Sequence, residues 1–379
     1  MHIEIQPHML SWACRRAGYT IQQLAERIPQ LVEWEAGEIR PTLKQIERFA
    51  KTVHVPVGYL FLKTPPKENV PIPDFRTVSN KHLAQPSPDL LDTIYICQQR
   101  QSWYREYAVS YGEKPLYFVK QAKIADDPRI VAKKIRHALG FEIAERQQMK
   151  TWEEALRKFI EQVDELGVLV MVNGVVGNNN KRKLDPEEFR GFTLSDELAP
   201  LIYINGADSK SAQMFTLAHE LAHIWLGESG LSNFDPTGNT KNKIELWSNR
   251  VAAEILVPLE QFKSEYQNAE DLSKNMNVLA RCFKVSTLVI LRRIYDAGYI
   301  TQDQFWKGYK AEVKRLHDLP KGSGGNFYLT QSARVSKRFA RSLISSTLEG
   351  ITLHRDAFRL LGFSKHSTFE ALGHSLGVI

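Results

Sequence analysis

Two histidines four residues apart offer the clearest chemistry in this chain of 379 residues. They are His219 and His223, in the apolar run Phe215-Thr-Leu-Ala-His-Glu-Leu-Ala-His-Ile-Trp-Leu226. On a helix such residues share one face, so both imidazoles could reach one ion while Glu220 contacts a water beside it. This HExxH arrangement is typical of zinc sites with a carboxylate as general base. The alternative is two core histidines that happen to have this spacing.

A catalytic zinc ion needs a third protein ligand, and two candidates lie downstream. Glu245 and Glu254 are nine residues apart, which places them on opposite sides of a helix, so only one can face the metal. The small residues Ala252 and Ala253 share the face of Glu245 and would let this helix approach the first one closely. Asn249 lies on the same face and could hold a ligand histidine in place.

We therefore expect a Zn²⁺ site with Glu220 as the catalytic base and three ligands, His219, His223 and Glu245. Asn249 is expected to support the metal ligands from behind, and Glu254 either does the same or lies at the surface. The reverse assignment, with Glu254 as the ligand, remains the alternative.

These two segments resemble the ImmA/IrrE family of zinc metallopeptidases, which carry an FTLAHELGH-like helix and an E-x-x-A-N-x-F-A-A-E-x-L-x-P helix. The matching positions are Phe215 to His223, then Glu245, Asn249, Ala252, Ala253, Glu254, Leu256 and Pro258. The chain departs from the pattern at Ala222, Ser248 and Val251, where the family usually has glycine, alanine and phenylalanine. The first glutamate of the second motif is the ligand in that family, which also implies Glu245. The resemblance extends to most of the chain, because larger members also have a helix-turn-helix head and a basic tail.

The resemblance implies an intracellular zinc metallo-endopeptidase that cleaves a regulatory protein, such as a transcriptional repressor, in response to stress or DNA damage. Glu220 would take a proton from the metal-activated water and pass it to the leaving amine. The predicted strand Leu201–Ile204 could be the edge on which an extended substrate pairs. The alternative function is a helix-turn-helix regulator or antitoxin that binds a toxin or operator DNA, with the peptidase fold used as a binding body.

The head, residues 8–61, resembles the helix-turn-helix of Cro/repressor-type (XRE) regulators. Capping boxes at Thr20 and Thr42 begin two of its predicted helices. Its recognition helix would be short, and glutamates surround it, which phosphates would repel. A role in dimerisation or partner docking is therefore the alternative to DNA reading, and a homodimer is compatible with such a head.

The rest of the chain predicts an α+β fold that is mostly helical. Residues 1–62 are the head, residues 63–150 a proline-rich linker with connecting helices, and residues 151–318 a zincin-like metallopeptidase domain. Predicted strands near residues 167–172, 189–194 and 201–204 indicate a small, mostly antiparallel sheet, with a polar loop at residues 177–183. Residues 319–379 form a basic helical C-terminal segment, which begins with a glycine-rich linker at residues 318–326. Residues 279–294 also look like a helix-turn-helix, for which we favour a packing role.

Charge and composition limit which classes of protein this chain could belong to. Lys and Arg exceed Asp and Glu by 50 to 43, and the whole excess lies from Lys307 onward. The tail residues expected to contact nucleic acid are Arg334, Lys337, Arg338 and Arg341. The three cysteines are too few and too scattered for a disulfide framework. No long apolar run predicts a membrane span, and the N-terminus does not look like a secretory signal, so we expect a cytoplasmic protein.

Overall fold

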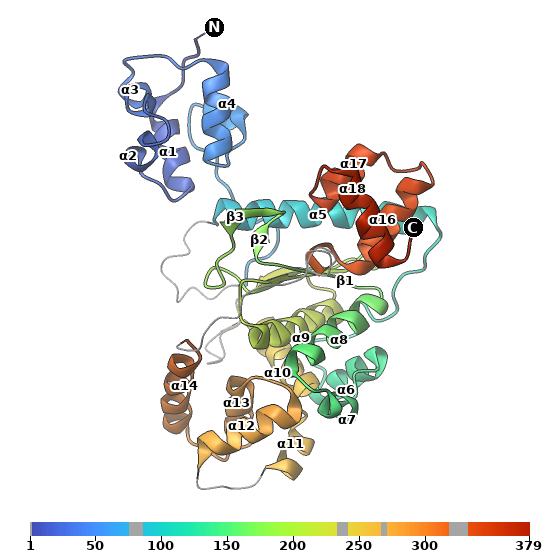
Figure 1. Ribbon diagram of the computed structural model, residues 1–379. Helices are drawn as coiled ribbons and strands as arrows, with labels where there is room; N and C mark the ends of the chain where they lie inside the picture. Colours follow the sequence, from blue (N-terminus) through green and yellow to red (C-terminus); the bar gives the residue numbers. More distant parts are fainter. Residues whose placement is uncertain (1, 76–85, 233–241, 267–270, 318–332) are drawn as a thin grey trace. The chain divides into compact units, whose positions relative to one another are not determined.

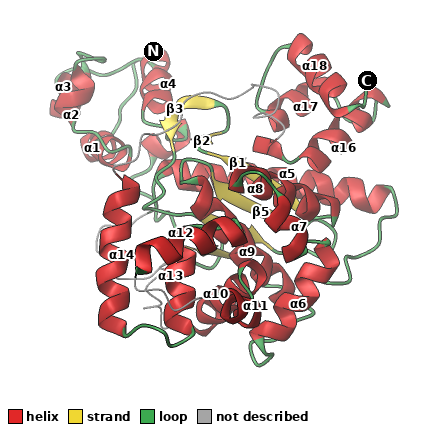
Figure 2. Cartoon of the chain, turned by 60° about the horizontal axis from the view of Figure 1, so that its bottom comes forward, coloured by secondary structure: helices red, strands yellow, loops and turns green. Residues whose placement is uncertain are grey.

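The computed structural model describes residues 2–75, 86–232, 242–266, 271–317 and 333–379. The chain divides into two compact units, one of Met1–Pro71 with Lys81–Ile94 and the other of Ile72–Asn80 with Tyr95–Ile379. Helices make up most of the described chain, and strands are confined to a small sheet and a hairpin (Figure 2). The predicted α+β, mostly helical class is therefore confirmed. No helix among these residues combines the length and apolarity needed to cross a lipid bilayer.

The first unit begins with a cluster of short helices (Figure 1). These are α1 (Pro7–Arg16), α2 (Ile21–Ala25), α3 (Leu31–Ala36), α4 (Leu43–Thr52) and the 3-10 helix η1 (Val57–Phe61). Both predicted capping boxes form, at Thr20 with Gln23 and at Thr42 with Gln45. The helix at the recognition position, α3, has only six residues, as the sequence predicted. Whether this head reads DNA stays a prediction.

Proline shapes the segments on either side of the long helix α5 (Pro88–Ser110). None of the described residues between Phe61 and Pro88 is helical, as expected from the proline-rich stretch. The connecting helices expected within residues 63–150 are present, but residues 111–127 between two of them are not helical. Gly112 has φ +67 and Pro115 follows, so a helix cannot continue there. The next helices are α6 (Pro128–Leu139), α7 (Ile143–Gln148) and α8 (Trp152–Glu165).

A four-stranded sheet lies at the centre of the second unit, in the order β1-β5-β4-β6. The strands are β1 (Leu169–Asn173), β4 (Gly191–Leu194), β5 (Leu201–Asn205) and β6 (Gly230–Ser232). β4 pairs antiparallel with β5 and β6, but β1 pairs parallel with β5, so the sheet is mixed. In Figure 1 the sheet lies between α5 on one face and α8 and α9 on the other. The sequence did not predict β6.

Two sequence predictions about strands are wrong. Residues 177–183 were expected to be a loop, but β3 (Asn179–Lys183) pairs with β2 (Val175–Val176) as a hairpin. Its polar side chains hid the strand, because it packs no apolar face against a core.

The strand at residues 201–204 was expected to offer a free edge to substrate. It is the interior strand β5, whose two edges are taken by β1 and β4, so an extended peptide cannot pair with it.

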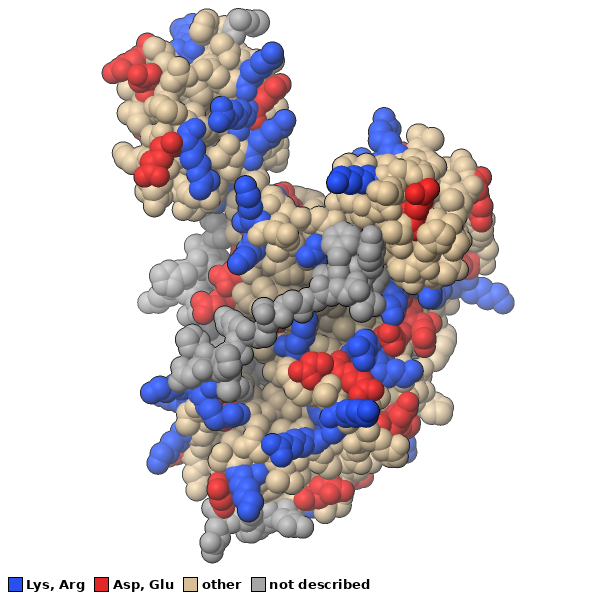
Figure 3. All heavy atoms as spheres, in the orientation of Figure 1, with Lys and Arg blue, Asp and Glu red and all other residues tan. Residues whose placement is uncertain are grey.

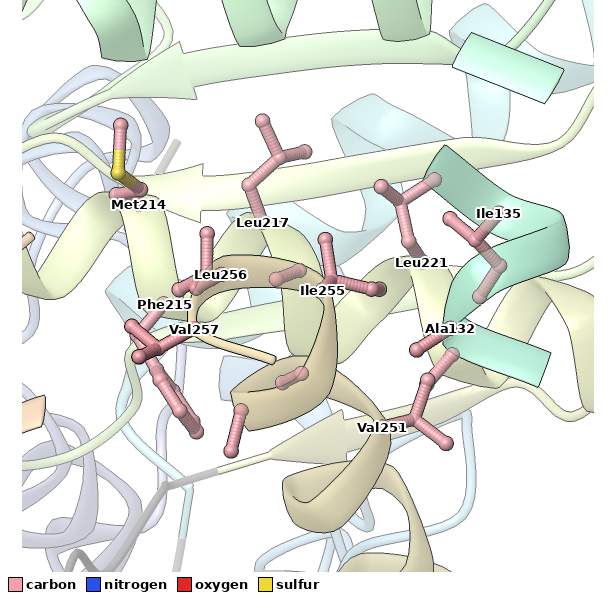
Figure 4. Packing of buried hydrophobic residues seen from close by; sticks show 14 of the residues in the cluster. Ala132, Ile135, Met214, Phe215, Leu217, Leu221, Val251, Ile255, Leu256 and Val257 are labelled. Carbon is pink, nitrogen blue, oxygen red and sulfur yellow. The ribbon is translucent and has the colours of Figure 1, made fainter. Parts of the chain in front are cut away.

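The main core joins α9 (Lys210–Leu226) to α10 (Lys243–Leu256) and α6. Figure 4 shows Leu217 and Leu221 of α9 beside Ile255 of α10 and Ile135 of α6. Fully burying one such side chain contributes about 1.5–3 kcal/mol. This packing fixes the distance between the two helices that carry the predicted metal ligands.

The remaining helices complete the second unit. They are α11 (Leu259–Glu265), α12 (Leu272–Phe283), α13 (Thr287–Asp296), α14 (Gln302–His317), α16 (Lys337–Leu348), α17 (His354–Leu361) and α18 (His366–Leu376). Buried residues of α12 and α13, such as Leu279 and Ile290, belong to the main core. The helix-turn-helix-like segment at residues 279–294 therefore contributes to the packing of this core. The predicted linker at residues 318–326 lies outside the described residues.

Candidate metal centre

The two histidines lie in the C-terminal half of α9, a helix with well-defined ends. The Ser209 hydroxyl accepts a hydrogen bond from the Ala212 amide at 3.3 Å, and Gly227 ends the helix in the left-handed conformation. Nearly every residue between them is buried, because the sheet covers one side of α9 and α10 another. The Nε2 atoms of His219 and His223 are 3.1 Å apart.

Glu245 reaches the same point from the first turn of α10. Its Oε2 lies 3.4 Å from Nε2 of His219, and its Oε1 lies 3.1 Å from Nε2 of His223. Asn242 fixes the start of this helix by accepting a hydrogen bond from the Ile244 amide at 2.9 Å. The structure thus brings together the three predicted ligands, which come from two helices.

The geometry of this triad fits a zinc ion. One atom from each of His219, His223 and Glu245 lies within 4.8 Å of the others. Ligands about 2.1 Å from a tetrahedral zinc lie roughly 3.4 Å from one another, close to the spacings of 3.1 and 3.4 Å found here. Two imidazole nitrogens and a carboxylate are also the donor types that zinc prefers. Three ligands from the described residues would leave a coordination position open.

The same three groups shift one another's protonation. Burial would raise the pKa of Glu245, but the two histidines outweigh it and hold that pKa well below its usual range. Burial likewise would lower the pKa of His219, while the Glu245 carboxylate raises it above its ordinary value. His219 and Glu245 therefore each favour the charged form of the other.

Glu254 does not face the triad. Its Oε1 accepts from Nη2 of Arg293 at 2.7 Å, and its Oε2 accepts from the Leu259 amide at 3.3 Å. Arg293 also donates to the Val257 carbonyl at 2.7 Å. Glu254 thus joins the end of α10 to α13 through a buried ion pair. Glu245 and Glu254 thus lie on opposite sides of α10, as predicted.

Asn249 lies one turn beyond Glu245 on α10 and is half-buried. Its side chain acts on the His219 ring and helps to raise the pKa of that histidine. This placement agrees with the expectation that Asn249 supports a ligand histidine.

Glu220, the predicted catalytic base, is fully buried beside the triad. The Thr193 hydroxyl donates to its Oε2 at 2.7 Å, while none of the described residues hydrogen-bonds to its Oε1. Burial raises the pKa of Glu220, and the two histidines and Thr193 offset that effect only in part. β4 comes close enough to make this bond because residue 191 is glycine. A Cβ there would lie 2.6 Å from Thr216 and 3.2 Å from Oε1 of Glu220.

Two contacts of the site were not predicted. One is the Thr193 hydroxyl, and the other is Phe75, whose ring stacks on His223 with centroids 5.8 Å apart and planes 12° apart. Phe75 follows the proline-rich stretch, which the sequence predicted only as a linker. An apolar aromatic residue directly after that stretch was the available signal.

The four basic tail residues lie away from this site and have intramolecular partners. Arg334 donates to Oδ1 of Asn178 at 3.0 Å, and Arg341 donates to the Leu376 carbonyl at 3.2 Å. Lys337 pairs with Glu161 at 2.7 Å, and Arg338 donates to the Tyr104 hydroxyl at 2.6 Å. On the face shown in Figure 3, basic and acidic side chains are interspersed. Contact of the four with phosphate therefore stays a prediction without support from this geometry.

Comparison with known protein families assigns two parts of the chain. Residues 335–375 match a domain of unknown function (DUF8813). No curated protein matches the chain. Neither family match covers the head, so its helix-turn-helix resemblance remains an expectation. Residues 163–295, which include His219, Glu220, His223 and Glu245, match the model of the IrrE N-terminal-like domain (peptidase family M78), so this part of the chain is similar to the ImmA/IrrE family.

Proposed function

We propose that this protein is a zinc-dependent endopeptidase that cleaves a regulatory protein, with transcriptional repressors as the substrate class. The observation that carries the proposal is the buried carboxylate of Glu220 directly beside the triad of His219, His223 and Glu245. A structural zinc site usually has four protein ligands and needs no adjacent base. Here three described ligands and a nearby carboxylate support a catalytic role.

The residues of the site can be assigned steps in peptide hydrolysis. A zinc ion bound by the triad would polarise the substrate carbonyl and make a water molecule more acidic. Glu220 takes the proton from that water, and its raised pKa suits a base that works nearer to neutral pH than an ordinary carboxylate. The Thr193 hydroxyl holds one carboxylate oxygen and leaves the other available for the proton. Glu220 then donates this proton to the leaving amine.

The test is cleavage of a repressor-type protein encoded next to this chain, with zinc supplied. We expect the wild type to cut it and Glu220→Gln to lose at least about a hundredfold in rate, because the general base is removed. Zinc content should be equal in both, since Glu220 is not in the triad. Glu197→Gln, a change to an exposed surface carboxylate, is the matched control and should cleave normally.

Equal cleavage by Glu220→Gln and the wild type would contradict the proposal. If neither the wild type nor Glu220→Gln cuts the neighbouring protein but both bind it equally, the result favours the alternative function. In that case the protein is a regulator or antitoxin that uses the peptidase fold as a binding body. One observation favours that second function. His219, Glu220, His223 and Glu245 are each at most 3% exposed, which leaves a substrate little access in this conformation.

A further inference from the structure

A short piece of the chain covers the approach to the candidate metal centre. We propose that the segment Ile72–Phe75, called here the blocking segment, is a built-in occupant of the outer edge of β6 that keeps substrate from the site until it is displaced. The inference rests on the proposed peptidase function. It concerns how that same site is regulated.

The blocking segment pairs with β6 as an additional strand. The Leu231 amide donates to the Pro73 carbonyl at 2.9 Å, and the Phe75 amide donates to the Leu231 carbonyl at 3.0 Å. Asp74 is the parallel bridge partner of Leu231. Since the other edge of β6 pairs with β4, this segment occupies the edge where an extended peptide could add to the sheet on this side. The interior strand β5 offers no such edge.

Phe75 brings the segment to the metal ligands. Its ring stacks on the imidazole of His223, and residue 230 of β6 lies directly beneath it. A Cβ at Gly230 would lie 2.2 and 2.5 Å from two ring carbons of Phe75, and the third nearest atom also belongs to that ring. The absence of a side chain at this one position therefore creates the space that Phe75 fills.

Each of these contacts between the blocking segment and β6 or His223 is weak enough to be reversible. Two backbone hydrogen bonds join the segment to β6 and one half-buried aromatic ring stacks on His223, and each such contact is worth about a factor of ten in an equilibrium. The segment also follows the first unit directly along the chain, since Met1–Pro71 belong to that unit and Ile72–Asn80 belong to the second. A partner that binds the head thus has a covalent connection to the segment that blocks the site.

The experiment measures entry of Zn²⁺ alone into the metal-free full-length protein, by its transfer from a coloured chelator. Phe75→Ala should speed uptake about tenfold or more, because the ring over His223 is removed while the amide at residue 75 is retained. Gly230→Ala should have the same effect, since its methyl group displaces the ring. Tyr117→Ala, which changes a tyrosine that is 71% exposed, is the control and should leave the rate unchanged.

The double variant makes the test specific to this contact. Once Phe75 has been replaced by alanine, Gly230→Ala has nothing left to displace and should add no further increase. Equal uptake rates for the wild type and both single variants would overturn the proposal, and so would additive effects in the double variant. If uptake quickens as expected but no variant cleaves any protein, the blocking segment stands and the peptidase function fails. If Glu220-dependent cleavage occurs but these variants leave the rate of zinc uptake unchanged, the peptidase function stands and the blocking segment fails.

Discussion

At the scale of single residues, the hydrogen bond from Thr193 opposes the effect of burial on Glu220. Burial raises the pKa of this carboxyl, and the Thr193 hydroxyl lowers it by binding the ionised form. A base acts only when deprotonated, so activity is lost as pH falls through its pKa. Thr193→Val removes the hydrogen bond without changing the size of the side chain. The acid limb of the cleavage rate should therefore move to higher pH, as measured in a pH profile.

Thr193→Ser is the control for this prediction because it retains a hydroxyl at the same position. It should keep the acid limb near that of the wild type. Identical profiles for the valine and serine variants would mean that this hydrogen bond does not set the protonation of Glu220.

Local spacing explains which site residues the sequence could reveal. His219, Glu220 and His223 lie within one helical stretch, where a fixed spacing of residue types determines which side chains share a face. Thr193 is 27 residues away from Glu220 on a strand, and Phe75 is 148 residues away from His223. Their positions depend on sheet pairing and on the glycines at 191 and 230, and no local pattern encodes these.

At the scale of elements, α10 carries two glutamates with different tasks on opposite sides. Glu245→Gln should reduce zinc affinity by about 10-fold or more, because an anionic ligand is lost, while the fold is retained. Glu254→Gln should keep the zinc content but lower the free energy of unfolding by about 1–3 kcal/mol, because Arg293 loses its 2.7 Å ion pair and retains the longer one with Asp296 at 3.6 Å. Metal analysis of both variants checks the prediction about zinc binding, and denaturant unfolding of the two zinc-free proteins checks the prediction about stability.

The outcome that would contradict this division is a loss of zinc in Glu254→Gln with normal zinc binding in Glu245→Gln. Such a result would restore the alternative in which the second glutamate is the ligand. The two variants are matched, since both replace a buried carboxylate of the same helix by its amide.

Helices were easier to predict than strands in this chain for a physical reason. The helices carry their own signals, such as the capping boxes of α2 and α4 and an apolar stripe. β6 has three residues, and β3 is polar throughout, so each exists only through its partner strand. Likewise, the parallel pairing of β1 with β5 depends on how the chain returns to the sheet. A strand's register and neighbours are set by contacts far apart in sequence.

At the scale of the whole second unit, the C-terminal segment docks on α8, and one of the side chains involved, Lys337, was predicted to contact nucleic acid. The Arg338 amide donates to Oδ2 of Asp164 at 2.8 Å, and the Ser336 hydroxyl donates to Oδ1. Lys337 pairs with Glu161 of the same helix. Asp164 is buried, and this burial raises the pKa of its carboxyl. The basic character of the tail is thus partly used within the molecule.

A matched pair of arginine variants separates docking from phosphate contact. Arg338→Gln removes the 2.6 Å bond to Tyr104 and the ion pair with Glu113, so we expect it to lower the unfolding free energy by about 1–2 kcal/mol. Arg355→Gln changes a side chain that is 85% exposed and should have little effect. Denaturant unfolding measures both. If the original phosphate prediction is right instead, Arg338→Gln alone will weaken binding to duplex DNA and reduce the salt dependence by about one counterion, while unfolding stays unchanged.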